Sequence, residues 1–300
     1  MKTKIKAAVT ALLLPVITLA LLGYAAKPAA GFAIPVPAAP GAAAHKNGKA
    51  VIDYSNAKDG YVMVRYAQRT SKPLRVLIKG PSGVSYTYTL KSNGDYEVFP
   101  FSDGNGGYTV GVYEQVQGTK YAVANSATVK VALTDEFSPF IRPNQYVNYD
   151  KDKQTVRKAA ELAGGSAGLI DKISAIYNYV VNNLTYDKEL AMTVQSGYIP
   201  NVDAVLAKGK GICFDYSAVM AAMLRSLGIP CKMAVGYAGN VYHAWINAYS
   251  RETGWINQVI YFDGSSWKLM DPTFASSAKQ SSEIMKYIGN GSNYKTKFIY

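Results

Sequence analysis

The sequence predicts an α+β fold, in which a helix packs on an antiparallel sheet, preceded by an all-β sandwich. Short alternating apolar and polar runs, separated by Gly-, Pro- and Asn-rich turns, fill residues 50–134 and are typical of a sandwich. After residue 135 the apolar periodicity becomes helical, and one helix leads into several segments of strand character. The 300 residues therefore contain two successive folded domains.

The N-terminus has the form of a secretory leader. Three lysines lie among the first six residues, and residues 7–26 carry no charge. Gly23-Tyr24-Ala25 offers a cleavage site, so residues 1–25 are predicted to be a signal peptide. The alternative is an uncleaved anchor, because about 20 uncharged residues can span a bilayer. Both alternatives predict a secreted or cell-surface protein that contacts the membrane only through this segment.

The chain is basic. Its formal net charge is +12, and removal of the three leader lysines with residues 1–25 leaves +9. Such a charge favours anionic wall polymers or membrane surfaces as partners. The lysines are scattered through loops rather than clustered with aromatic residues, however, which is typical of an ordinary solvated surface and argues against nucleic acid as a partner.

Three segments follow the leader. Residues 26–49 are rich in Ala, Pro and Gly and predict an extended, poorly packed linker. Residues 50–134 are predicted to form the sandwich, of immunoglobulin-like type, and contain no His or Cys, so no catalytic group is expected there. Its expected strands are 61–66, 74–79, 86–90, 108–113 and 128–131. Residues 135–300 are the predicted catalytic domain.

The catalytic domain begins with helices and ends with strands. The 3-and-4 spacing of apolar residues predicts a long helix over 169–184, followed by a loop and a short helical turn at 202–206. A second helix is expected from Cys213 to Leu227, ended by a glycine and a proline. Strands are expected at 232–237, 241–249, 256–262 and 267–271, and a final strand within 287–300.

The chain has only two cysteines, which argues against a disulfide-rich scaffold. Cys213 begins the expected helix and Cys231 follows its end. A helix of about 14 residues separates them by roughly 20 Å, too far for a disulfide. Both thiols are therefore expected to be free, with Cys231 buried in a strand.

Cys213, His243 and Asp271 could form a catalytic triad. A cysteine at a helix N-terminus feels the positive end of the helix dipole, which favours the thiolate. His243 could accept the thiol proton and return it to a leaving amine, and Asp271 could hold the imidazole tautomer. This combination predicts nucleophilic catalysis of acyl transfer.

Other residues near these three are candidates for contact with the substrate or an oxyanion. The backbone N–H of Cys213 is one predicted oxyanion donor, and Tyr186 is a candidate for the second. Asp215, Tyr242 and Trp245 are further candidates for substrate contact. Two alternatives stay open: Asp215 as a charge at the helix N-terminus, and Trp245 as a core aromatic.

These residues resemble the transglutaminase-like superfamily of papain-type cysteine enzymes, in its bacterial secreted branch. The resemblance spans about residues 155–274 and rests on four fragments: Gly-x-Cys213 opening a helix, Gly-Ile-Pro230 closing it, His243-Ala-Trp, and Trp-x-x-x-Asp271-Pro-Thr. It implies that Cys213 is the nucleophile, His243 the general base and acid, and Asp271 the orienting residue. No metal-ligand spacing stands out near them, so no metal and no cofactor are expected.

The predicted function is extracellular acyl transfer at peptide or isopeptide amide bonds through a thioester. Water as the acceptor would give a peptidase or amidase, which is the favoured interpretation, and a lysine amine would give a protein-crosslinking transglutaminase. A catalytically silent surface-binding protein is the alternative outside enzymology. The expected partner is a protein or peptide, for example one in the cell wall.

Overall fold

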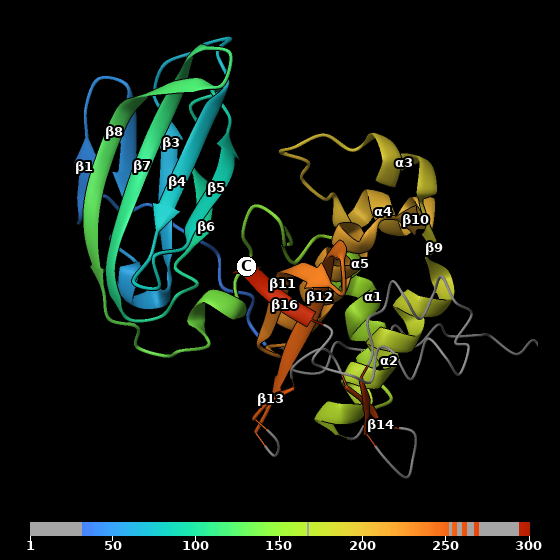
Figure 1. Cartoon of the computed structure of the whole chain (residues 1–300). Coiled ribbons are helices and arrows are strands. Elements are labelled where there is room, and N and C mark those ends of the chain that lie inside the picture. Colours follow the sequence, from blue (N-terminus) through green and yellow to red (C-terminus); the bar gives the residue numbers. More distant parts are fainter. Residues whose placement is uncertain (1–31, 167, 252–253, 257–259, 263–266, 270–293) are drawn as a thin grey trace, which may run out of the picture. The chain divides into compact units, whose positions relative to one another are not determined.

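The computed structural model describes residues 32–166, 168–251, 254–256, 260–262, 267–269 and 294–300 (Figure 1). Gly31–Tyr300 forms one compact unit. The predicted signal peptide, residues 1–25, and the predicted triad residue Asp271 lie outside the described residues. In the part of the chain that is described, no helix is long and apolar enough to cross a membrane.

Two four-stranded antiparallel sheets form the N-terminal part. Their orders are β1-β2-β3-β6 and β5-β4-β7-β8. The strands are β1 (Ala44–Lys46), β2 (Ala50–Asp53), β3 (Tyr61–Tyr66), β4 (Leu74–Lys79), β5 (Ser85–Leu90), β6 (Glu97–Pro100), β7 (Gly106–Gln117) and β8 (Lys120–Val131). Buried residues of both sheets, such as Val64 and Val76, share one core. The antiparallel sheets agree with the prediction, whereas the immunoglobulin-like type stays a prediction.

Part of the predicted linker is packed. β1 pairs with β2, and the backbone N–H of Ala38 donates to the Tyr61 hydroxyl at 3.1 Å. The ring of Phe32 lies against Gly228, which has a φ of +76°. Edge-strand pairing uses backbone groups that every residue carries, so an Ala- and Pro-rich segment can join a sheet without an apolar run.

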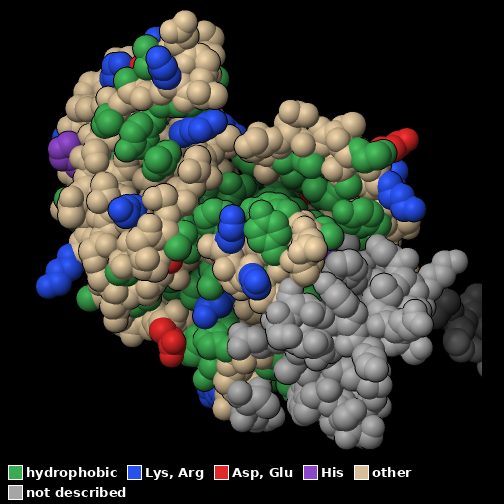
Figure 2. All heavy atoms as spheres, viewed as in Figure 1, with side chains coloured by type: hydrophobic (Ala, Val, Ile, Leu, Met, Phe, Trp, Pro, Cys, Tyr) green, Lys and Arg blue, Asp and Glu red, His purple; other side chains and the backbone are tan. Residues whose placement is uncertain are grey.

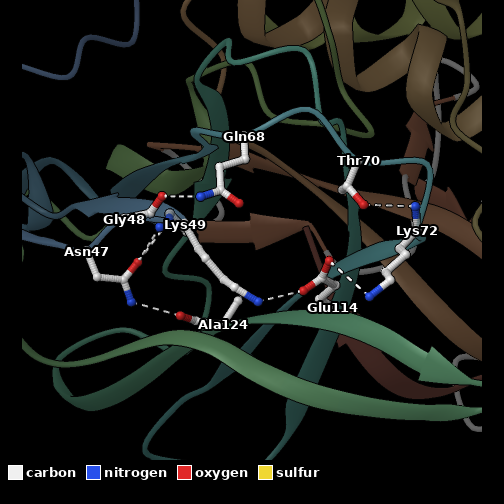
Figure 3. Close-up of polar contacts among 9 residues, drawn as sticks. Asn47, Gly48, Lys49, Gln68, Thr70, Lys72, Glu114 and Ala124 are labelled. Atoms are coloured by element: carbon white, nitrogen blue, oxygen red, sulfur yellow. Dashed lines mark hydrogen bonds and ion pairs between the residues drawn. The ribbon is translucent and has the colours of Figure 1, made fainter.

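A polar network ties β7 to two loops of this part (Figure 3). The Glu114 carboxylate lies 2.8 Å from Lys49 Nζ and 3.7 Å from Lys72 Nζ. The hydrogen bond from Lys49 is the main cause that lowers the pKa of Glu114. Both lysines are exposed, so the network contributes little to stability.

Five α-helices of the described chain precede the second group of strands: α1 (Gln154–Ala163), α2 (Leu169–Asn183), α3 (Lys188–Thr193), α4 (Val202–Lys208) and α5 (Cys213–Ser226). Two 3-10 turns, η1 (Ala57–Asp59) and η2 (Ser138–Phe140), precede them. α5 is the central helix and packs on α1, α2, α4 and two strands. Its buried small residues, including Ala218 and Ala222, allow this close approach.

The helix predictions differ from the structure in two places, α1 and α3, neither of which was expected. The helices expected at 169–184, 202–206 and 213–227 are confirmed as α2, α4 and α5. The loop expected after the first of them is wrong in part, because it contains α3. Asp187 caps this helix by accepting the backbone N–H of Leu190 at 3.0 Å.

The main C-terminal sheet is antiparallel, with the order β13-β12-β11-β16. Its strands are β11 (Cys231–Ala238), β12 (Val241–Ser250), β13 (Gly254–Ile256) and β16 (Tyr294–Ile299). β14 (Ile260–Phe262) pairs with β15 (Trp267–Leu269), and β9 (Thr185–Tyr186) runs parallel to β10 (Lys210–Gly211). The final strand expected within 287–300 is confirmed as β16. The single strand expected over 256–262 is divided between β13 and β14.

Candidate active site

Cys213 is the first residue of α5 and is partly exposed. Ile212 precedes the helix with extended backbone angles, φ −95° and ψ 175°. Because α5 has 14 residues and begins at Cys213, the thiol lies at the positive end of the helix dipole. The sequence prediction of this placement is confirmed.

Two backbone N–H groups at the start of α5 have no acceptor among the described residues. The N–H groups of Asp215 and Tyr216 both donate to the Ile212 carbonyl, at 2.9 and 3.1 Å. Among the described residues, none accepts the N–H of Cys213 or of Phe214. Free amides at the start of a helix are suited to stabilise an oxyanion beside the thiol. The second donor was not identified from the sequence, because any residue supplies the N–H of Phe214.

Asp215 is buried and caps α5. Its carboxylate accepts the backbone N–H of Ile212 at 2.9 Å and the Tyr198 hydroxyl at 2.7 Å. Burial is the main cause that raises the pKa of this carboxyl. Both oxygens are directed to the protein, so the structure supports the helix-terminal alternative and argues against substrate contact.

Glycine is required at position 211. A Cβ there would lie 2.7 Å from the Cβ of Asp215, closer than two carbon atoms can approach. The backbone at position 211 can therefore lie against the buried Asp215 side chain only if residue 211 has no side chain. Gly211 fixes the path of the backbone that leads to Cys213.

Asp187 holds this same segment from the other side, through β9 and β10. Its N–H donates to the Gly211 carbonyl at 2.8 Å. Its buried carboxylate lies 2.8 Å from Lys208 Nζ and 3.2 Å from Lys210 Nζ, and the hydrogen bond from Lys208 is the first cause that holds its pKa well below the usual range. This cluster was not predicted from the sequence, since no motif links residues about 20 positions apart.

Tyr186, which was predicted as a candidate oxyanion donor, is the second residue of β9. It pairs with Gly211 in the parallel β9–β10 ladder, two residues before Cys213, and its side chain is partly exposed. The structure thus places the Tyr186 backbone beside the segment that precedes Cys213. A role for its hydroxyl stays a prediction.

His243 is buried on β12, opposite Gly236 of β11. α5 packs on both strands, with Ala244 and Ile246 in the core that it shares with them. By strand alternation, His243 lies on the other face of the sheet, together with Trp245. In the described part of the chain, no hydrogen bond joins the Cys213 thiol to the His243 imidazole. The helix and the strand are in contact, but the described residues do not show the imidazole beside the thiol, so the triad stays a prediction.

Trp245 and Tyr242 occupy different environments. Trp245 is buried, and its ring lies 5.0 Å from that of Tyr294, which supports the core alternative and argues against substrate contact. Tyr242 is 55% exposed at the start of β12. Its pKa is raised first by partial burial, then by Tyr237 and by Cys213, so Tyr242 lies within electrostatic reach of the Cys213 thiol.

Cys231 cannot serve as an alternative nucleophile. It is fully buried at the start of β11, and burial raises the pKa of its thiol to about 12. Both cysteines are free, as predicted. The described residues contain no group of three or more His, Cys, Asp or Glu that could hold a metal ion.

Residues 156–272 match the family model of the transglutaminase-like superfamily, so the chain carries a domain of that superfamily. This segment contains α2 to α5 and the strands around His243. The chain is also 28% identical, over 197 residues, to the uncharacterized protein YebA of Bacillus subtilis (strain 168). The match covers 56% of this chain and 26% of YebA, so it spans about a quarter of that relative.

Two solved structures are similar at low sequence identity. The periplasmic domain of TgpA from Pseudomonas aeruginosa is 16% identical with a TM-score of 0.36, covering 83% of this chain and 78% of that one. Red sea bream transglutaminase is 14% identical with a TM-score of 0.32, covering 76% and 53%.

Proposed function

We propose that the chain is an extracellular cysteine-dependent enzyme that hydrolyses peptide or isopeptide amide bonds through Cys213, His243 and Asp271. The observation that carries the proposal is the start of α5. There a partly exposed cysteine lies with two backbone N–H groups that have no acceptor in the described part of the chain, inside the segment that matches the transglutaminase-like superfamily. A nucleophile beside oxyanion donors is the arrangement that acyl transfer requires.

In the proposed first step His243 takes the thiol proton, and the Cys213 sulfur attacks the amide carbonyl carbon. A C–S bond forms, and the carbonyl oxygen becomes an oxyanion that accepts the N–H groups of Cys213 and Phe214. The C–N bond then breaks as His243 returns the proton to the leaving amine. Asp271 would accept the other imidazole N–H and stabilise the imidazolium. The product of this step is a thioester on Cys213.

The second step decides the class of enzyme. For hydrolysis, His243 takes a proton from water, the oxygen attacks the thioester, and the C–S bond breaks to give a carboxylate and the free thiol. If a lysine amine attacks instead, the product is a new isopeptide bond, as in a crosslinking transglutaminase. Hydrolysis is the proposal, because water needs no separate acceptor surface, and the sequence and the structure give no reason to assign one.

The test compares the wild-type chain with Cys213→Ala on a panel of peptide amides, with mass spectrometry of the products. The proposal predicts carboxylate products and their loss in Cys213→Ala, with Cys231→Ala as the matched control that retains activity. Hydroxylamine should intercept the thioester as a hydroxamate. Unchanged turnover in Cys213→Ala would refute it, and isopeptide products with an added lysine peptide would establish the transferase alternative.

One observation favours binding as a second candidate function. A surface cavity of about 620 Å³ in the N-terminal sheets is lined by Arg69, Thr70, Ser71, Lys91, Ser92 and Asn93. In the described structure neither Arg69 nor Lys91 forms an ion pair. A polyanion of the cell surface, such as polyphosphate, should then bind to this cavity, and its affinity should fall as salt is added. The affinity should be lower for Arg69→Ser/Lys91→Ser than for the control Lys79→Ser. Binding unaffected by the paired substitution would remove this candidate.

A further inference from the structure

Exposed aromatic and cationic side chains lie side by side on three strands next to Cys213. In Figure 2 hydrophobic side chains and blue Lys or Arg side chains are neighbours over this part of the sheet. We define the aromatic–lysine strip by its members on β11, β12 and β16, which are Tyr237, Tyr242, Lys295 and Lys297. Tyr242 is 55% exposed, and Tyr237 is 36% exposed.

The strip follows one row of the sheet. Tyr242 of β12 pairs with Tyr237 of β11, which pairs in turn with Lys295 of β16. Directly paired residues have their side chains on the same face. The two tyrosine rings are 5.5 Å apart, and Lys297 Nζ lies 5.2 Å from the Tyr237 ring centroid. The row is therefore one continuous surface.

The strip carries an unbalanced positive charge. Residues 231–250 and 294–300, which form its three strands, contain no Asp or Glu. Within the described residues, Lys295 and Lys297 have no carboxylate partner. Asp215, which follows Cys213, and Asp187, which follows β9, are both buried, and their carboxylates already have partners. A ligand with carboxylates would supply the missing charge.

The strip starts at Tyr242 and ends at Lys295. Arg225, near the end of α5, bonds the Cys231 carbonyl at the start of β11, so Cys213, at the opposite end of α5, lies toward the end of β11 and the start of β12, where Tyr242 is. Neighbouring strands are about 4.8 Å apart, so two steps across the sheet span about 10 Å. An extended peptide covers that distance with about three residues. A peptide that places its scissile amide at Cys213 and crosses the tyrosines would bring its third residue to the lysines.

We propose that the aromatic–lysine strip is the substrate-docking surface of the enzyme, and that the substrate is a peptide with a carboxylate about three residues from the reacting amide. The tyrosine rings would pack on the intervening residues, and the two lysines would select the carboxylate. This inference rests on the proposed function, because the position of the carboxylate is counted from the amide that reacts with Cys213. It adds the substrate class and two specificity-determining residues.

The test uses peptide amides that differ only at the third residue, which is Glu, Gln or Lys. The expected wild-type kcat/KM falls in that order, with Glu over Gln by about fivefold, the effect of one or two solvent-exposed ion pairs. In Lys295→Gln/Lys297→Gln this preference should disappear through KM, with kcat retained. Lys79→Gln, an exposed lysine on β4, is the control that keeps the preference.

A binding measurement separates this inference from the proposed function. Fluorescence anisotropy would follow the labelled Glu and Gln peptides on Cys213→Ala and on the same chain with both lysines replaced. Preferential binding of the Glu peptide that depends on the lysines supports the strip even if no peptide is hydrolysed, in which case the proposed function alone fails. Hydrolysis or binding with no charge preference, or a preference that survives in Lys295→Gln/Lys297→Gln, would overturn the strip.

Discussion

The carboxylate of Asp215 accepts the backbone N–H of Ile212 at 2.9 Å, so a buried acid two residues after Cys213 closes the first turn of its helix. The Tyr198 hydroxyl donates a hydrogen bond to the other carboxylate oxygen at 2.7 Å. The carboxylate is thus directed backward, into the protein. This arrangement leaves the N–H groups of Cys213 and Phe214 as the only unsatisfied donors in the described helix start.

Replacement of the cap should separate hydrogen bonding from charge. Asp215→Ala removes the cap and leaves the Tyr198 hydroxyl without its acceptor, so the free energy of unfolding should fall by about 1–2 kcal/mol. Asp215→Asn keeps an oxygen for the Ile212 N–H and should cost much less. Urea unfolding of both variants measures this, and equal losses would show that the hydrogen bond to Ile212 is not what the acid contributes.

The Asp187 cluster predicts an acid-sensitive contribution to stability. Its pKa is depressed from the ordinary 3.8, with the hydrogen bond from Lys208 as the first cause. As the pH falls, the Asp187 carboxylate takes up a proton in the unfolded state before it does so in the folded state. The stabilising contribution of Asp187 is therefore present above pH 3.8 and is lost as the pH falls through the lower pKa of the folded state.

Melting temperatures of wild type and Asp187→Asn should therefore differ most near neutral pH and converge on acidification. Glu189→Gln is the matched control, because that side chain is exposed and lies 3.9 Å from Lys210. It should behave as wild type at every pH. A difference between wild type and Asp187→Asn that is independent of pH would contradict the ion-pair account.

Arg225 should be among the most sensitive positions for stability. It is fully buried in α5, and its guanidinium donates to the carbonyls of Cys231, Arg142 and Tyr300 at 2.8, 3.0 and 2.6 Å. Charged hydrogen bonds contribute about 1.5–3 kcal/mol each, offset in part by the cost of burying the charge. Arg225→Met should lower the free energy of unfolding by about 3 kcal/mol or more.

The matched control is Arg157→Met on α1, an exposed arginine whose replacement should cost less than about 0.5 kcal/mol. Urea unfolding measures both. A loss in Arg225→Met no larger than in the control would show that the three carbonyls find other donors. It would also show that the hydrogen bonds of Arg225 do not hold α5 to the segments around β11 and β16.

Much of the fold follows from local pattern. The bounds expected for β3 and β4 are those observed, and α5 ends one residue before the predicted Leu227. These elements have strong periodicity and clear ends, such as Gly228 after α5. β1 and α3 were not predicted, because a three-residue edge strand and a six-residue helix depend on their neighbours rather than on an apolar pattern. α1 was not predicted either, because the residues that it buries, Thr155 and Ala159, are small.

The candidate site was predictable to a similar extent. The position of Cys213 at a helix start and the burial of Cys231 follow from glycine, proline and apolar neighbours along the chain. The Asp187–Lys208 pair and the free N–H of Phe214 leave no such signal, since they depend on pairing between distant segments and on backbone geometry. The roles of Asp215 and Trp245 needed burial to decide between their alternatives.

Alkylation with iodoacetamide from pH 5 to 9, followed residue by residue by mass spectrometry, tests the central claim most directly. A thiolate–imidazolium pair predicts rapid labelling of Cys213 near pH 6 that slows in His243→Ala. Buried Cys231, with its raised pKa, should stay unlabelled in the folded chain and serves as the internal control. Labelling of Cys213 only above about pH 8, equal in both proteins, would contradict the proposal that His243 activates Cys213.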